Sequence, residues 1–171
     1  MVYYSGMSKV YVIMGVSGCG KTTVGLALAK KLEVPFYDGD DFHPPHNVAK
    51  MASGIPLDDD DRTPWLARLH DLIAEHLARG ETAVLACSAL KKKNRDQFQV
   101  SVQVQFVYLE GDFDLIWERM RARPPDHYMK PEMLLSQFEA LEAPDEDKAI
   151  RISIDHPVEK ILSRIQEEIG A

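Results

Sequence analysis

Residues 15–22 read Gly15-Val16-Ser17-Gly18-Cys19-Gly20-Lys21-Thr22, which matches the pattern G-x-x-x-x-G-K-[ST] of a phosphate-binding loop. The apolar, β-branched run at residues 9–14 comes directly before the loop and predicts a buried strand. Residues 23–32 follow with apolar side chains among good helix formers and predict a helix. This order of strand, glycine loop and helix is the context that the motif requires.

The chemistry of this loop predicts a site for nucleotide phosphates. Its three glycines let backbone N–H groups approach phosphate oxygens, and the N-terminus of the following helix adds partial positive charge. We expect Lys21 to reach the β- and γ-phosphates and the Thr22 hydroxyl to ligate Mg²⁺. The position of Cys19 in the loop requires only a small side chain. A glycine-rich turn that merely starts a helix is the alternative, and the flanking strand and helix argue against it.

Length and composition are typical of one globular domain. The chain has 171 residues, of which 45% are hydrophobic and 27% charged, enough for a full core. Residues 9–171 are therefore predicted to form a single domain. Residues 1–8 lack hydrophobic periodicity and are predicted to be a flexible N-terminal extension.

Charge and cysteine content limit which partners and which cellular location can be expected. The net charge of −7 argues against nucleic acid and membrane surfaces as partners. The two cysteines form no disulfide framework, and no set of metal-ligating residues is spaced for a metal site. The longest apolar runs have the length of strands, which predicts neither a membrane span nor a secretory signal. A cytoplasmic protein is the simplest expectation.

Strand and helix patterns alternate along the chain, which predicts an α/β fold with a parallel sheet and helices on both faces. Five strands are expected, at residues 9–14, 36–38, 82–86, 102–109 and 150–154. Helices are expected at 23–32, at 46–53, from Thr63-Pro64 to Gly80, shortly after Leu90, from Asp112 to the break at 123–125, at 131–141 and at 157–169. Ligands of such sheets collect at the carboxyl ends of the strands, where we therefore look for the site.

An acidic segment, Asp38-Gly39-Asp40-Asp41, directly follows the second predicted strand. Acids two residues apart on an extended segment project the same way. Phosphoryl transfer needs a second anchor for Mg²⁺ and a carboxylate that orients the attacking hydroxyl, so we assign Asp38 to the metal and Asp40 to the substrate proton. His43 comes next and is a candidate hydrogen-bond partner of the substrate. An acidic turn without function is the alternative.

Two cations farther along are candidates for holding an anionic substrate. Arg62 follows four consecutive acids, so it either pairs with them or forks to a substrate carboxylate. The acids themselves suit the positive end of the helix expected after them. Lys91 follows small residues at the end of the third strand, where it would neutralise an anion; Lys92 and Lys93 are interpreted as an exposed basic turn.

Arg119 and Arg123 are spaced four residues apart, which predicts that they share one helix face. A proline-rich segment containing His127 and Tyr128 follows, and residues 123–131 are predicted to form a mobile lid. An arginine brought over a γ-phosphate would stabilise charge in the transition state. A solvated basic helix face is the alternative.

Taken together, these segments resemble the gluconate kinase (gluconokinase) family of small P-loop kinases, which is related to shikimate kinase. The resemblance is carried by residues 15–23, by the Asp38 to Pro44 string DGDDFHP, by Gly54-Ile55-Pro56-Leu57, Asp61-Arg62 and Pro64-Trp65-Leu66, by Cys87-Ser88-Ala89-Leu90-Lys91 and by Ser136-Gln137-Phe138-Glu139-Ala140-Leu141-Glu142. The glycine loop is common to many families, whereas the later strings are more selective. Near the lid this chain is richer in proline than the family pattern.

The resemblance implies a three-layer P-loop kinase fold, ATP and Mg²⁺ as cofactors, a homodimer, and phosphorylation of D-gluconate at its 6-hydroxyl. By resemblance, ATP lies against the loop, Arg119, Arg123 and Pro157; Thr22 and Asp38 hold Mg²⁺; Lys21, Asp40 and Arg123 are catalytic; and Asp40, His43, Arg62 and Lys91 hold the sugar acid. The loop residues implied are Gly15, Val16, Ser17, Gly18, Cys19, Gly20, Lys21, Thr22 and Thr23.

Two other readings stay open at this point. A kinase for another small acceptor, such as shikimate or a nucleoside monophosphate, would share most of these features. A nucleotide-dependent switch without turnover is the other, although no Asn-Lys-x-Asp string for reading guanine is present. The acidic acceptor region also suits a polyol better than a second nucleotide phosphate.

Overall fold

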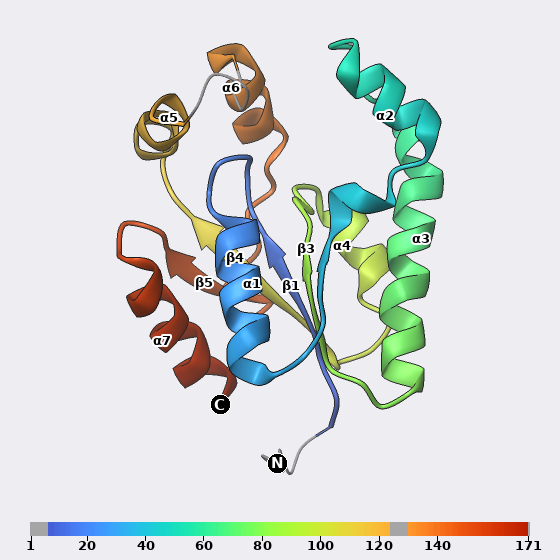
Figure 1. The fold of residues 1–171 in the computed structure, drawn as a ribbon, viewed down its shortest axis with the longest axis vertical. Helices are drawn as coiled ribbons and strands as arrows, with labels where there is room; N and C mark the ends of the chain where they lie inside the picture. Colours follow the sequence, from blue (N-terminus) through green and yellow to red (C-terminus); the bar gives the residue numbers. More distant parts are fainter. Residues whose placement is uncertain (1–6, 124–129, 171) are drawn as a thin grey trace.

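The computed structural model describes residues 7–123 and 130–170 and contains a five-stranded parallel sheet (Figure 1). The strand order is β2-β3-β1-β4-β5, and every neighbouring pair runs parallel. The strands are β1 Val10–Met14, β2 Phe36–Asp38, β3 Ala83–Ala86, β4 Val104–Glu110 and β5 Ala149–Ser153. The predicted α/β class and the five parallel strands are therefore confirmed.

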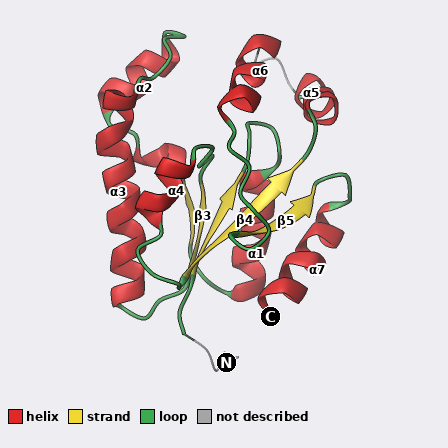
Figure 2. Ribbon diagram, turned by 180° about the vertical axis from the view of Figure 1, so that it is seen from behind, coloured by secondary structure: helices red, strands yellow, loops and turns green. Residues whose placement is uncertain are grey.

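Helices lie on both faces of the sheet and at one of its ends (Figure 2). The α-helices of the described residues are α1 Lys21–Leu32, α2 Pro45–Ala52, α3 Asp59–Ala78, α4 Lys92–Phe98, α5 Phe113–Arg121, α6 Pro131–Ala140 and α7 Val158–Ile169, with a 3₁₀ helix, η1, at Gly39–Phe42. Helices α1 and α7 cover one face and α3 and α4 the other. None of the described helices is long and apolar enough to cross a bilayer.

The central strand β1 is buried on both faces and divides its side chains between two cores. Tyr11 and Ile13 pack on the side of α1 and α7, whereas Val10, Val12 and Met14 pack on the side of α3. This alternation follows from the two-residue period of a strand. A strand covered on both faces reads as a continuous apolar run, which is why residues 9–14 were recognisable in the sequence.

Helices α2, α5 and α6 and the 3₁₀ helix η1 lie at the end of the sheet toward which the strands point, and this end positions the site (Figure 1). Helices α5 and α6 lie on one side of the loop that follows β1, and η1 and α2 lie on the side of β2 (Figure 1). The chain leaves β1 at the centre of the sheet, reaches β2 at the edge and returns to β3 beside β1. Crevices at such reversals of strand order are where α/β folds bind ligands.

The predicted start of the long helix at Thr63-Pro64 is wrong, because α3 begins at Asp59. Asp58 caps the helix: its side chain accepts from the Asp61 N–H at 2.7 Å, and the Asp61 side chain accepts from the Asp58 N–H at 3.0 Å. This reciprocal capping box satisfies free N–H groups of the first turn. Pro64 therefore lies inside the helix, where it has no N–H to donate to the preceding turn.

The segment after β2 was expected to be extended, but residues 39–42 form the 3₁₀ helix η1, which the Asp38 side chain caps. The remaining elements differ from the predictions only at their ends. Helix α1 begins at Lys21 rather than residue 23, and β4 begins at Val104 rather than residue 102. The expected extension at 1–8 and the expected lid at 123–131 fall mostly on residues 1–6 and 124–129, outside the described residues. Of the extension, Ser8 is described, and its carbonyl accepts from Gln103 Nε2 at 2.9 Å.

Replacing Asp61 with asparagine is expected to lower the melting temperature at pH 7. The Lys50 ammonium, 2.8 Å from the Asp61 carboxylate, and then the Asp58 N–H hold the pKa of Asp61 at about 2. A carboxyl with a depressed pKa contributes stability above its unfolded-state pKa of about 3.9, and this contribution is lost as the pH falls through the folded-state pKa. The melting-temperature difference should thus be constant near neutral pH and shrink below about pH 4.

Thermal unfolding over a pH series measures this effect. Asp60→Asn is the matched control, because Asp60 is exposed in the same helical turn. The control should melt close to the wild type, since exposed substitutions away from such contacts change stability little. Equal losses in the two variants would show that general charge at the start of α3, rather than the Asp61 contacts, is responsible.

Candidate active site

The loop between β1 and α1 is shaped by glycines that no other residue could replace without strain. Gly20, the N-cap of α1, has φ 98°, a value that favours glycine. Gly15 has φ 148°, and a Cβ built on it would lie 2.9 Å from the Leu109 carbonyl oxygen and 2.7 Å from Cys19 Sγ. The loop is therefore pressed against the end of β4 while its far side lines a cavity.

Lys21 is the first residue of α1 and folds back over the loop. Its Nζ donates to the carbonyl oxygens of Gly15 and Val16, both at 3.0 Å. An ammonium group has three donors and a flexible stem, so these contacts can be exchanged for a stronger anionic acceptor. The lysine is thus already located at the loop where an anion would lie.

Acidic side chains at the end of β2 face the start of α1. Asp38 Oδ2 lies 3.4 Å from Thr22 Oγ1, and Asp38 Oδ1 accepts from the Asp40 N–H at 3.0 Å, capping η1. This pairing of a hydroxyl and a carboxylate supplies oxygen ligands, which Mg²⁺ prefers, and one or two carboxylates are the usual protein share of such a site. The residues present therefore fit a magnesium ion.

The Asp40 side chain is largely exposed and lines the cavity. Loss of hydration is the largest cause that raises its pKa, and the nearby negative charge of Asp38 raises it further. The positive charge of Lys21 acts in the opposite direction. A carboxylate with a raised pKa is a better proton acceptor than an ordinary aspartate.

These groups share one cavity of about 450 Å³. Its described lining comes from the loop and the start of α1, from the ends of β2 and β3, and from the end of α5: Ser17, Gly18, Gly20, Lys21, Thr22, Thr23, Asp38, Asp40, Ala86, Cys87, Ser88, Met120 and Arg123. Lys21 and Asp40 thus lie on the wall of the same cavity. Val16 and Cys19 are buried beneath the loop, and burial raises the pKa of the Cys19 thiol, so the cysteine fits the small structural residue expected.

His43 is held at the edge of this site by an aromatic neighbour. Its ring is buried and stacks on Trp65 of α3, with 4.3 Å between ring centroids and 14° between planes. Its Nε2 lies 3.9 Å from Asp40 Oδ1. Trp65 is held in turn, because its Nε1 donates to the Gly39 carbonyl at 2.7 Å. Nothing in the sequence around Trp65 indicates these contacts, which depend on the packing of α3 against η1.

Arg62 and Lys91 are not among the described residues that line the cavity. Arg62 Nη1 lies 3.4 Å from Asp59 Oδ1, so the expected pairing with a neighbouring acid is present. Its charge nevertheless contributes to lowering the pKa of His43, after the larger effect of burial. Lys91 is the N-cap residue of α4 and directly follows the loop that contributes Ser88 to the cavity wall.

The two arginines near the end of α5 do not share a helix face as predicted. Helix α5 ends at Arg121, so Arg123 lies beyond it and reaches the cavity wall. Arg119 lies inside the helix, and its Nη2 donates to the Ile154 carbonyl at 2.6 Å. That contact directs Arg119 toward the segment before Pro157, which is the N-cap of α7. The helix therefore ends two residues before Arg123.

Gln137 of α6 contacts the phosphate-binding loop, and its position in the sequence did not predict this contact. Its Oε1 accepts from the Ser17 N–H at 2.6 Å, and its Nε2 donates to Ser17 Oγ at 2.7 Å. The two bonds join residues 120 positions apart. Periodicity places Gln137 on a helix but gives no sign of this partner; the selective string at 136–142 was the only signal.

The central strand of the parallel sheet leads into a phosphate-binding loop, and carboxylates share one cavity with that loop. These features define a P-loop kinase of small molecules. Residues 17–169 match the model of the shikimate kinase family. The thermosensitive and thermoresistant gluconokinases of Escherichia coli K12 are 43% and 44% identical to this chain, each over 94% of it and over 87% and 93% of their own lengths. The chain belongs to the gluconokinase family.

A solved structure agrees with this assignment. The crystal structure of a gluconokinase from Sinorhizobium meliloti 1021 is 38% identical to this chain and superposes with a TM-score of 0.83. The match covers 96% of this chain and 97% of that one. The resemblance stated from the residues is therefore confirmed at the level of family and fold.

Proposed function

We propose that this protein transfers the γ-phosphoryl group of ATP to the 6-hydroxyl of D-gluconate, giving 6-phospho-D-gluconate and ADP. One observation carries the proposal: Lys21, at the phosphate loop, and Asp40, the candidate for the acceptor hydroxyl, line the same cavity. Membership of the gluconokinase family supports gluconate as the acceptor. In-line transfer requires the two reacting oxygens to meet in such a shared space.

At the nucleotide end, N–H groups of residues 15–23 and the N-terminus of α1 would bind the phosphates. Lys21 would exchange its loop carbonyls for β- and γ-phosphate oxygens and stabilise the charge that develops there. Thr22 and Asp38 would hold Mg²⁺, which neutralises phosphate charge when bound. Arg123 would reach the γ-phosphate from the cavity wall, and Arg119 and Pro157 would lie beside the adenine.

At the acceptor end, Asp40 would accept the hydrogen bond of the 6-hydroxyl and take its proton as the new P–O bond forms. His43, 3.9 Å from Asp40, would contact the sugar acid beside it. Arg62 and Lys91 would attract the gluconate carboxylate. The influence of Arg62 on His43 supports its placement at this end of the cavity, and Lys91 adjoins the loop that carries Ser88.

A coupled assay of ADP release tests the proposed function. The panel holds gluconate, other sugar acids, shikimate and nucleoside monophosphates, each with ATP and Mg²⁺. We expect gluconate to be phosphorylated far faster than the rest, and ATP hydrolysis without an acceptor to be slow. Equal rates on every acceptor, a preference for shikimate or a nucleotide, or no rate above background would each overturn the assignment.

Removal of Mg²⁺ by a chelator is expected to abolish activity, with recovery on adding Mg²⁺ back. Asp38→Asn should raise the Mg²⁺ concentration needed for half-maximal rate, because it removes the carboxylate that faces Thr22. Asp41→Asn is the matched control, since Asp41 lies exposed in the same η1 segment. The same Mg²⁺ requirement in the Asp38 variant and the wild type would remove Asp38 from the metal site.

Gln137→Ala is expected to weaken ATP binding about two- to tenfold while leaving the KM for gluconate unchanged. The reason is that the variant loses both bonds to Ser17, so the loop must be ordered by the nucleotide itself. Nucleotide titration calorimetry and steady-state kinetics measure the two constants. Ser136→Ala, exposed on the same helix, is the control. Tighter ATP binding in the Gln137 variant would show that Gln137 competes with phosphate instead of supporting the loop.

We also propose a cytoplasmic homodimer with a single kinase domain in residues 9–171, a flexible extension at 1–8 and a mobile lid at about 123–131. Light scattering of the purified protein measures the mass. Limited proteolysis with and without ATP tests the extension and the lid: cleavage within 123–131 should slow when nucleotide is bound.

A further inference from the structure

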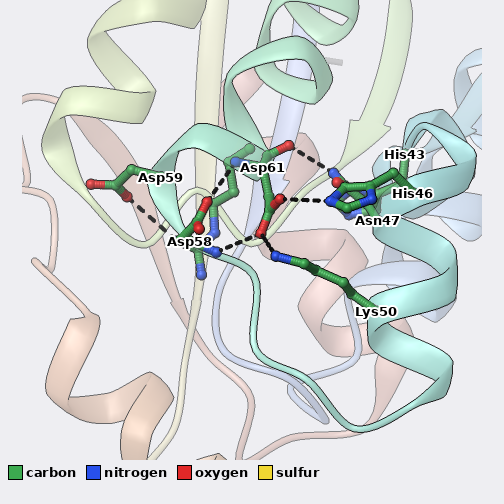
Figure 3. Close-up of polar contacts among 8 residues, drawn as sticks. His43, His46, Asn47, Lys50, Asp58, Asp59 and Asp61 are labelled. Atoms are coloured by element: carbon green, nitrogen blue, oxygen red, sulfur yellow. Dashed lines mark hydrogen bonds and ion pairs between the residues drawn. The ribbon is translucent and has the colours of Figure 1, made fainter.

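We infer that Asn47 is a positioning residue that keeps the proton of His43 on Nε2, so that His43 serves the reaction as a hydrogen-bond donor and not as a base. The inference rests on the proposed function for the role of His43, but the state of the ring follows from contacts in the free protein. Asn47, Asp61 and His43 come from α2, α3 and the end of η1, and Figure 3 shows the three side by side.

Asn47 makes its contacts through the amide nitrogen. The residue is 1% exposed, and its Nδ2 donates to the Asp61 carbonyl at 2.8 Å and lies 3.2 Å from His43 Nδ1 (Figure 3). The orientation of the amide follows from the first contact. A backbone carbonyl can only accept, so the group that faces it must be the NH₂ and not the amide oxygen.

The Asp61 carbonyl is itself firmly held. Asp61 lies in the capped first turn of α3, and its side chain contacts Lys50 at 2.8 Å and His46 at 3.2 Å, both from α2 (Figure 3). These contacts fix α2 against α3. The acceptor that orients the Asn47 amide therefore cannot turn away without breaking the capping box.

The amide then determines the state of the imidazole. A donor placed against Nδ1 requires Nδ1 to accept, so the ring is neutral and its proton is on Nε2. An imidazolium, which donates from both nitrogens, would set N–H against N–H at this position. Burial of the ring lowers the pKa of His43 and agrees with a neutral ring. The remaining donor, Nε2–H, faces the Asp40 carboxylate. Arg62 is the other charged group that affects the pKa of the ring, which it lowers.

An additional observation separates this role from simple packing. Asn47 Oδ1 is buried and has no hydrogen-bond partner among the described residues. Burying an acceptor without a partner is unfavourable, so an apolar residue would pack better if nothing depended on the NH₂ group. Asparagine is present here in spite of this cost, and both of its amide hydrogens are used: one faces the Asp61 carbonyl and the other faces His43 Nδ1.

The test is the ¹⁵N NMR spectrum of the imidazoles in the full chain, where the two-bond coupling pattern distinguishes the tautomers. The His43 signals are assigned by their loss in His43→Gln. We expect the Nε2–H form in the wild type near neutral pH. Asn47→Ala should give a mixture of tautomers, and Asn47→Asp, which places an acceptor against Nδ1, should move the proton to Nδ1 or charge the ring.

Lys50→Met is the matched control for a merely structural effect. It removes a contact between α2 and Asp61 but does not touch the ring, so the Nε2–H form should persist. In the kinetic arm, Asn47→Ala should lower kcat/KM for gluconate about tenfold at unchanged KM for ATP. An Nδ1–H ring in the wild type, or an unchanged tautomer in both folded Asn47 variants, overturns the inference. Failure of the proposed function would appear separately, as absence of gluconate turnover with the tautomers as expected.

Discussion

Asp40→Asn is expected to lower kcat for gluconate by about 10²–10⁴-fold while ATP binding stays nearly unchanged. The amide keeps the size of the side chain but cannot take the proton of the attacking hydroxyl. Asp40 belongs to η1 and not to the loop, so the substitution leaves the loop N–H groups and Lys21 in place. Single-turnover kinetics and ATP titration measure the two effects.

The matched control for this variant is Asp41→Asn, the next residue in η1, which should retain most of the activity. The wild type should also lose kcat/KM as the pH falls through the pKa of Asp40, because only the ionised carboxylate can accept a proton. That acidic limb should lie above the range of an ordinary aspartate, since loss of hydration and the charge of Asp38 raise this pKa. Unchanged turnover in Asp40→Asn would remove the residue from catalysis.

Lys21→Met is expected to lower kcat by about 10²–10³-fold, the usual cost of removing a charged donor that stabilises the transition state. The stem of the side chain is kept, so the effect reports on the ammonium group. In the free protein the same group donates to the Gly15 and Val16 carbonyls, so the loop also loses two hydrogen bonds. Chemical denaturation of the variant separates this loss of stability from the loss of rate.

The control for Lys21→Met is Lys30→Met, which removes an exposed lysine from the last turn of the same helix. It should change neither kcat nor the KM for ATP beyond about twofold. A Lys21 variant whose kcat equals that of the control would exclude an electrostatic role of Lys21 in the transition state.

Much of the architecture was predictable because its signals are local. The loop at 15–22 has a backbone requirement that only its glycines meet, and β1 reads as a continuous apolar run because helices cover both of its faces. The pattern of strands and helices then leaves few topologies for a parallel sheet. The start of α3 was missed because Thr63-Pro64 looks like a helix start, while Asp58 and Asp61 form the actual cap.

The parts of the site that escaped prediction depend on contacts between distant segments. Trp65 looks like a core residue of an amphipathic helix, and nothing in its neighbours shows that His43 stacks on it. Gln137 meets Ser17 only because α6 returns over the loop. Arg119 and Arg123 were expected on one helix face, but α5 ends before Arg123, and the Arg119 side chain donates to the Ile154 carbonyl. Spacing along the chain specifies a helix face, not the partner on the other side.

The placement of β1 at the centre of the sheet has a consequence during synthesis on the ribosome. Residues 10–14 leave the ribosome well before their two neighbours, β3 and β4, which begin only at Ala83 and Val104. Until both have emerged, this apolar segment has an open edge that is available for wrong pairing. Nascent chains that stop before β4 should therefore depend on chaperones and should not retain nucleotide, whereas chains that extend past α6 should acquire that ability abruptly.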